Sequence, residues 1–149
     1  MTITAISDYI TGSFEASYIT EADGDFFFFF GEDNRFPFAT IVTKDNDFDN
    51  SSHLDREGFY RLNVGIDKET FNTLFGSVPA TKGFGGYLES GIDFTQENTL
   101  MPHPMYGTMY WVCMINPREE AIASLQPLLR MAYDKAVERE HKRNGDQTA

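Results

Sequence analysis

Apolar residues in the middle of the chain occur in short runs and alternations that are typical of β-strands. Residues 26–30 are five consecutive phenylalanines, which predicts a strand covered on both faces. The polar connection over residues 31–35 is short, so the strand expected at 38–43 should pair antiparallel with the first. A third strand is expected over residues 59–66. Its alternation places Tyr60, Leu62, Val64 and Ile66 on one face and Phe59, Arg61 and Asn63 on the other.

Helical spacing appears on both sides of these strands. Isoleucines recur at intervals of three and four over residues 3–10, which predicts a short helix that Gly12 ends. Asp67 is suited to cap a second helix that runs to Phe75 and stops at Gly76. A fourth strand is expected over residues 106–115.

The C-terminal part of the chain predicts a helix with a defined start. Residues 116–119 read Asn-Pro-Arg-Glu, the pattern of a capping box with proline at the first helical position. Pro127 should interrupt that helix or restart it, with Ser124 as the new cap. From about residue 143 the sequence is polar, which is typical of a frayed tail. One apolar stripe follows the expected restart: Leu129, Ala132, Tyr133 and Ala136.

The order α-β-β-β-α-β-α predicts one domain over residues 1–149. Its fold class is α+β, with an antiparallel four-stranded sheet and helices packed on it. Residues 77–105 form a long connection, and loops of this length are typical of lids, binding loops or disordered segments.

The charge of the chain excludes some classes of partner. Acidic residues number 23 and basic residues 12, for a net charge of −11, which opposes binding to nucleic acid. Cys113 is the single cysteine, so no intramolecular disulfide can form. This is typical of cytoplasmic proteins, and we expect a cytoplasmic location. No basic segment precedes an apolar one at the N-terminus, and no apolar run is long enough to cross a membrane.

Four segments carry a family resemblance. They are Pro-Phe-Ala-Thr-Ile-Val at 37–42, Phe-Tyr-Arg-Leu-Asn-Val-Gly at 59–65, Met-Pro-His-Pro-Met-Tyr at 101–106, and 111–117, which opens with Trp-Val-Cys and ends with Asn-Pro. Together they resemble an uncharacterised bacterial family known only as a domain of unknown function. More distantly, the order of elements is similar to the MmcQ/YjbR family. That resemblance implies a fold like that of type III secretion chaperones, and it implies neither an activity nor catalytic residues.

Metal and cofactor chemistry finds little support in the sequence. The acidic segment Asp45–Ser51 begins like a calcium loop, but its sixth position is Asn50 and its twelfth is Arg56, where glycine and glutamate are needed. A solvated acidic loop is the better interpretation. His53 and His103 have no spacing that is typical of zinc ligands. We expect no metal and no cofactor.

Arg61, Asn63, His103 and Tyr106 are the candidate ligand-binding residues. Arg61 and Asn63 share a strand face, and two prolines hold His103 in a rigid loop that should close one side of a pocket. Such a pocket would bind an anionic or carboxylate-bearing small molecule. In the rival interpretation, Arg61 is neutralised by Asp47 or Asp49, while His103 faces solvent or caps a backbone carbonyl of its own loop.

Three functions follow from these residues. The first is a non-catalytic binding module for a small anionic ligand or a protein. The second is an enzyme that uses His103 with Arg61 and a carboxylate of the acidic loop. The third is a homodimeric, chaperone-like interaction protein whose spare phenylalanines form the interface.

Overall fold

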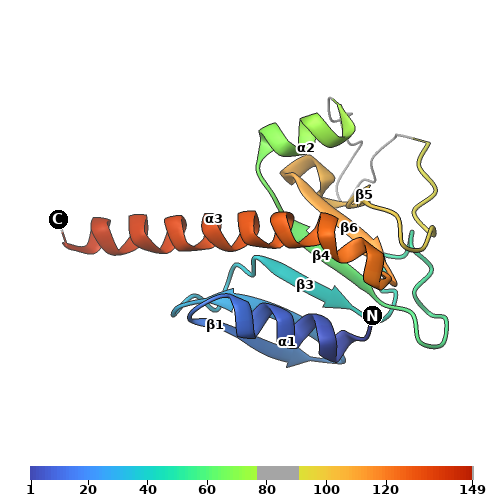
Figure 1. The fold of residues 1–149 in the computed structure, drawn as a ribbon, viewed down its shortest axis with the longest axis horizontal. Coiled ribbons are helices and arrows are strands. Elements are labelled where there is room, and N and C mark those ends of the chain that lie inside the picture. The colour runs from blue at the N-terminus through green and yellow to red at the C-terminus, as the bar shows by residue number, and fades with distance from the viewer. Residues whose placement is uncertain (77–90, 149) are drawn as a thin grey trace.

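The protein is described here by a computed structural model, which covers residues 1–76 and 91–148, with side chains up to residue 144. Two long helices pack on one side of an antiparallel sheet, and a shorter helix lies at its end (Figure 1). The helices are α1 (Ile3–Ser13), α2 (Lys68–Phe75) and α3 (Ile122–Thr148), with 3-10 helices η1 (Tyr106–Met109) and η2 (Glu119–Ala121). The strands are β1 (Ser17–Ala22), β2 (Asp25–Phe30), β3 (Ala39–Val42), β4 (Arg61–Gly65), β5 (Met101–Pro102) and β6 (Trp111–Ile115).

The sheet confirms the α+β class and the antiparallel pairing. Its strand order is β1-β2-β3-β4-β6-β5, and every neighbouring pair is antiparallel. The sheet has six strands, however, so the expectation of four was wrong. The two missed strands lie at the edges. β1 is mostly exposed and lacks an apolar alternation, and β5 is only two residues long, so neither carries the pattern that identifies a strand.

One face of the sheet forms the main core. The side chains of β4 that were expected on one face, Leu62 and Val64, are buried there beneath α1 and α3. The stripe of α3 is confirmed, since Leu129, Ala132, Tyr133 and Ala136 all belong to this core. At the far end of the core, Phe14 stacks on Tyr133 with a centroid separation of 4.8 Å.

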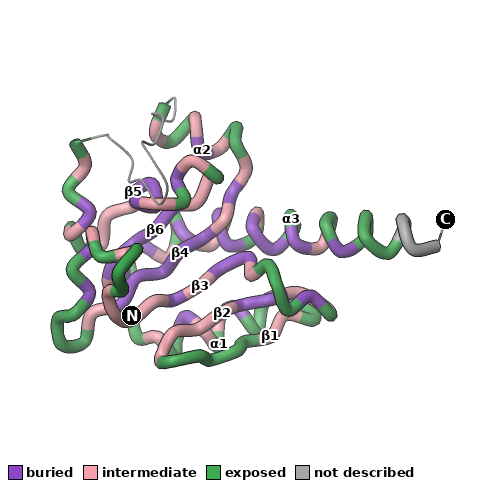
Figure 2. Tube along the Cα trace, turned by 180° about the vertical axis from the view of Figure 1, so that it is seen from behind, coloured by how far each residue is buried: buried purple, intermediate pink, exposed green. Residues whose placement is uncertain are grey.

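The opposite face of the sheet is covered by irregular segments. Leu54 and Phe94 of these segments pack there against Met101 of β5 and against Cys113 and Ile115 of β6. Seen from this side, buried residues continue along β4 and β6 (Figure 2). The candidate residues of β4 therefore lie between two packed layers.

The start of the C-terminal helix differs from the expected capping box. Asn116 caps no helix. Its side chain accepts a hydrogen bond from the Tyr60 N–H (3.1 Å) and donates one to Glu97 (3.0 Å), so it joins the ends of two strands. η2 comes next and leads directly into α3. Pro127 lies within α3 without ending it, and Ser124 donates to the Ala121 carbonyl (2.8 Å) instead of capping a restart.

Three further boundaries were also wrong. Residues 106–109 form η1, so the last long strand begins only at Trp111. α1 includes Gly12 and ends at Ser13. α3 extends to Thr148, where a frayed tail from about residue 143 was expected, and its second half reaches past the sheet (Figure 1).

Within the described part of the chain, no helix is both long enough and apolar enough to cross a membrane. The long 77–105 connection is described from residue 91 onward, and its first part, 77–90, lies outside the described residues.

Candidate functional site

β4 places Arg61 and Asn63 on the sheet face away from the long helices. Strand alternation requires this, because Leu62 and Val64 occupy the main core. Arg61 pairs in register with Val42 of β3 and Ile115 of β6, which puts it inside the sheet with a strand on either side. Its side chain is 0% exposed. A guanidinium group remains charged even when buried, so its surroundings must supply acceptors.

The hydrogen-bond donors of Arg61 converge on four side chains. Its Nε donates to Asn63 Oδ1 (2.7 Å), and its two terminal nitrogens form a fork on the Asp49 carboxylate, at 3.0 and 2.5 Å. Nη1 also donates to Ser52 Oγ (2.8 Å), and Nη2 lies 3.0 Å from His103 Nε2. Asn63 extends the chain of contacts by donating to Thr40 Oγ1 (2.9 Å). We call this group, Thr40, Asp49, Ser52, Arg61, Asn63 and His103, the Arg61 cluster.

The acidic segment is folded onto the sheet at one point, so the expected solvated loop is only partly correct. Asn46 accepts hydrogen bonds from the backbone N–H groups of Phe48 and Asp49, both at 2.8 Å, which turns the loop back on itself. Asp45 accepts from the Leu54 N–H (2.9 Å). These local bonds aim Asp49 at Arg61, and the Asp49 side chain retains 15% exposure.

His103 is held by its own loop as well as by the cluster. Its backbone N–H donates to the Trp111 carbonyl (2.9 Å), where β5 joins β6. Nδ1 of its ring accepts the backbone N–H groups of Met105 (3.1 Å) and Tyr106 (3.0 Å). Burial lowers the pKa of His103 well below its ordinary value, and the neighbouring Arg61 charge lowers it further. The imidazole is therefore neutral at neutral pH.

The two ring nitrogens of His103 face more donors than they can accept. A neutral imidazole has one acceptor nitrogen and one N–H. Backbone N–H groups keep their protons, so Nδ1 is the acceptor and Nε2 carries the hydrogen. That hydrogen points into the Arg61 cluster, where the Arg61 guanidinium is itself a donor. The Asp49 Oδ2 atom lies 3.9 Å from Nε2, too far for a hydrogen bond. The cluster thus lacks one acceptor.

Cys113 lies beside the cluster, in register with Asn63 and Met101. Its thiol contacts the Pro102 carbonyl at 3.6 Å. Burial raises the pKa of the thiol to about 12, so it stays protonated and unreactive at neutral pH.

The structure brings three of the four expected residues together. Arg61, Asn63 and His103 are in one network, and Tyr106 stands at its rim, 48% exposed with its ring centroid 5.0 Å from that of His103. The rival interpretation is right about Arg61, which pairs with Asp49. It is wrong about His103, which is buried and whose ring accepts two backbone N–H groups instead of facing solvent or bonding a carbonyl. Ser52 and Thr40 were missed, because nothing in the sequence pattern distinguishes them from other hydroxyl residues.

Other candidates lie outside this network. His53 is exposed. Among the side chains that the structure describes, no three His, Cys, Asp or Glu residues are arranged to hold a metal ion.

The fold and the cluster define an α+β protein with a polar network buried beneath a six-stranded antiparallel sheet. The chain belongs to the family of unknown function DUF6194, whose model matches residues 1–145. Comparison with curated proteins and with solved structures finds no match to this chain. The distant similarity to the MmcQ/YjbR family stays a prediction.

Proposed function

We propose that this protein is a non-catalytic binding module for a small carboxylate-bearing ligand, which binds at the Arg61 cluster. The observation that supports this is the 3.0 Å approach of His103 Nε2 to the charged Arg61 guanidinium. With the ring hydrogen on Nε2, that hydrogen has no acceptor among the described residues. A buried donor without an acceptor costs about 1–3 kcal/mol. A ligand oxygen that accepts hydrogen bonds from both His103 Nε2 and Arg61 Nη2 would remove that cost.

Asp49 indicates which chemical group would fit. Arg61 already holds a carboxylate in the two-pronged geometry that guanidinium groups prefer, and the carboxylate belongs to a loop instead of a ligand. The hydrogen bonds of Asn46 and Asp45 join residues of that loop to one another and do not involve the sheet. An external carboxylate would take the place of Asp49 and add a contact to His103. Tyr106 would provide an aromatic wall at the entrance.

The geometry supports binding over catalysis by His103. A general base needs a free ring nitrogen within reach of the proton that it removes. Nδ1 is occupied by two backbone N–H groups, and Nε2 carries the ring hydrogen. His103 is thus suited to donate a hydrogen bond to an anion. Cys113, the nearby thiol, is protonated and does not supply a nucleophile.

Formate is the simplest probe of this proposal. In the wild-type protein, we expect formate to shift the backbone N–H resonances of Met105 and Tyr106 in a saturable manner, at constant ionic strength. Asp49→Asn removes the internal carboxylate and keeps the side-chain volume. This variant should be destabilised and should bind formate about tenfold more tightly, because the buried Arg61 charge has lost its partner.

Asp47→Asn is the matched control. Asp47 is exposed in the same loop, so the substitution makes the same change in net charge without touching Arg61. It should bind formate like the wild type. If formate shifts no resonance of the wild-type cluster, the proposal is wrong, and the network serves only to fasten the acidic loop to the sheet. The same conclusion follows if formate fails to raise the melting temperature of Asp49→Asn.

A further inference from the structure

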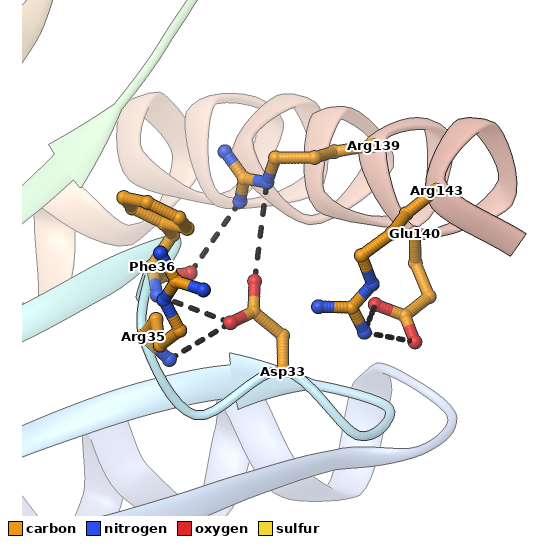
Figure 3. A pocket seen from close by; sticks show the side chains of 6 residues that line it. All are labelled: Asp33, Arg35, Phe36, Arg139, Glu140 and Arg143. Carbon is orange, nitrogen blue, oxygen red and sulfur yellow. Dashed lines mark hydrogen bonds and ion pairs between the residues drawn. The ribbon is translucent and has the colours of Figure 1, made fainter. Parts of the chain in front are cut away.

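A second polar site lies at the other end of β3 from Arg61. It is a pocket of about 110 Å³ between the β2–β3 connection and the second half of α3 (Figure 3). Val42, the last residue of β3, pairs with Arg61, whereas this pocket borders the turn before Ala39, the first residue. The two sites are therefore separate. We call this site the arginine pocket; it is lined by Asp33, Arg35, Phe36, Arg139, Glu140 and Arg143.

The two carboxylates of the arginine pocket are largely occupied by structural contacts. Asp33 Oδ1 accepts the backbone N–H groups of Arg35 (2.8 Å) and Phe36 (3.1 Å), which fixes the turn. Glu140 is gripped by Arg143, whose Nη2 lies 2.9 and 2.7 Å from its two oxygens. Glu140 thus neutralises the Arg143 guanidinium, and Asp33 Oδ1 is occupied by backbone N–H groups.

The remaining two guanidinium groups have little compensation. No carboxylate of the described residues lies within 4.0 Å of the Arg35 guanidinium, and Arg139 reaches Asp33 only at 4.0 Å. Both groups lie against the ring of Phe36, with guanidinium carbons 5.4 and 5.7 Å from the ring centroid. Figure 3 shows Phe36 close to Arg35 and Arg139 at one end of the pocket. Phe36 itself is 54% exposed.

We infer that the arginine pocket binds the phosphate group of a small phosphomonoester. Three guanidinium groups against two carboxylates leave the pocket positive, in a chain whose net charge is −11. Arg35 and Arg139 offer their donors to an anion, and arginine binds phosphate oxygens in a fork. The exposed ring of Phe36 offers a face to a planar group carried by the phosphate. A long polyanion is disfavoured, because the rest of the surface repels it.

The same contacts could serve only to dock α3 on the turn. Arg139 donates to the Phe36 carbonyl at 3.4 Å, and a stack of arginine on an aromatic ring stabilises packing by itself. Arg35 distinguishes the two roles. It is exposed and contacts Phe36, a neighbour in sequence, so its removal should affect phosphate binding more than folding.

Titration with phenyl phosphate at low ionic strength tests the inference. Binding is measured by calorimetry and by the shifts of backbone N–H resonances. We expect saturable binding at millimolar concentration, with shifts at Arg35 and Phe36 and none at Met105 and Tyr106. Arg35→Gln should weaken the affinity about tenfold. Phe36→Leu should weaken binding of phenyl phosphate while leaving that of inorganic phosphate unchanged.

Lys142→Gln is the matched control for the change in charge. Lys142 is an exposed residue of α3 beside Arg143, and it pairs with Glu138 at 3.4 Å outside the pocket. Its removal should leave the affinity within about twofold. If Arg35→Gln and Lys142→Gln weaken binding equally, the interaction is nonspecific and the inference is wrong. It is also wrong if phenyl phosphate does not bind the wild type, or if only the resonances of the Arg61 cluster shift.

Discussion

The Arg61 cluster and the arginine pocket use the same side chain under opposite conditions. Arg61 has no exposed surface, and every nitrogen of its guanidinium has a polar neighbour. Arg35 and Arg139 are exposed and lie against one aromatic ring. The buried group must be matched by its surroundings, because an unpaired charge inside a protein is costly. The exposed groups carry no such requirement, since water solvates them, and they remain available for an external anion.

The largest difference between the two sites should appear in stability. Arg61→Met leaves Asp49 facing the sheet without a cation and should lower the free energy of unfolding by about 3–5 kcal/mol. Arg35→Met makes the same chemical change at an exposed position and should alter it by less than about 0.5 kcal/mol. Denaturant unfolding of both variants measures the contrast. Equal, small effects would mean that water reaches the Arg61 cluster freely.

A second contrast concerns pH. Because the pKa of His103 is lowered in the folded protein, the unfolded chain binds this proton more strongly. The free energy of unfolding should therefore fall as the pH drops below 6.5, the ordinary histidine pKa, and should keep falling until the lowered pKa is reached. Above that window this group has no effect. The arginine pocket contains no histidine, so it adds nothing to this dependence from such a group.

Unfolding curves measured from about pH 5 to about pH 7 test this contribution, because histidine side chains titrate in this range. His103→Gln should flatten the pH dependence of stability within the window. His141→Gln is the control, since His141 is exposed on α3 and lies outside both sites. If the two variants retain the same slope, His103 does not resist protonation in the folded protein.

The sequence predicted which face of the sheet Arg61 occupies better than it predicted which side chains contact Arg61. Strand alternation over residues 59–66 was sufficient to separate Arg61 and Asn63 from the main core, because the period of a strand is fixed. The short turn at residues 31–35 was sufficient for antiparallel pairing. Asp49 was only one of two candidates, since the choice depends on hydrogen bonds made by Asn46, which follow no periodic rule.

The features that were missed depend on contacts between distant segments. Asn116 and Pro127 suggested a capped and interrupted helix. Asn116 instead accepts a hydrogen bond from the Tyr60 N–H, just before β4. Pro127 lies within a long helix that packs on the sheet. The arginine pocket left no local signal at all. Arg35 and Arg139 are far apart in the sequence, and they come to lie against the same ring, Phe36, through the packing of α3 beside the β2–β3 connection.

The smallest expected effect tests how far the buried network extends across the sheet. Thr40 accepts a hydrogen bond from the Asn63 amide, and Asn63 in turn accepts from Arg61. Thr40→Val preserves the side-chain shape but leaves that amide donor without its partner, so we expect a loss of about 1 kcal/mol in the free energy of unfolding. Thr20→Val is a control in the same row, because Thr20 and Thr40 both pair in register with Phe27, from β1 and β3 respectively. Thr20 is exposed on the edge strand, so its substitution should be neutral or slightly stabilising. Equal effects in denaturant unfolding would show that the network ends at Asn63. A loss confined to Thr40→Val would show that the network includes β3.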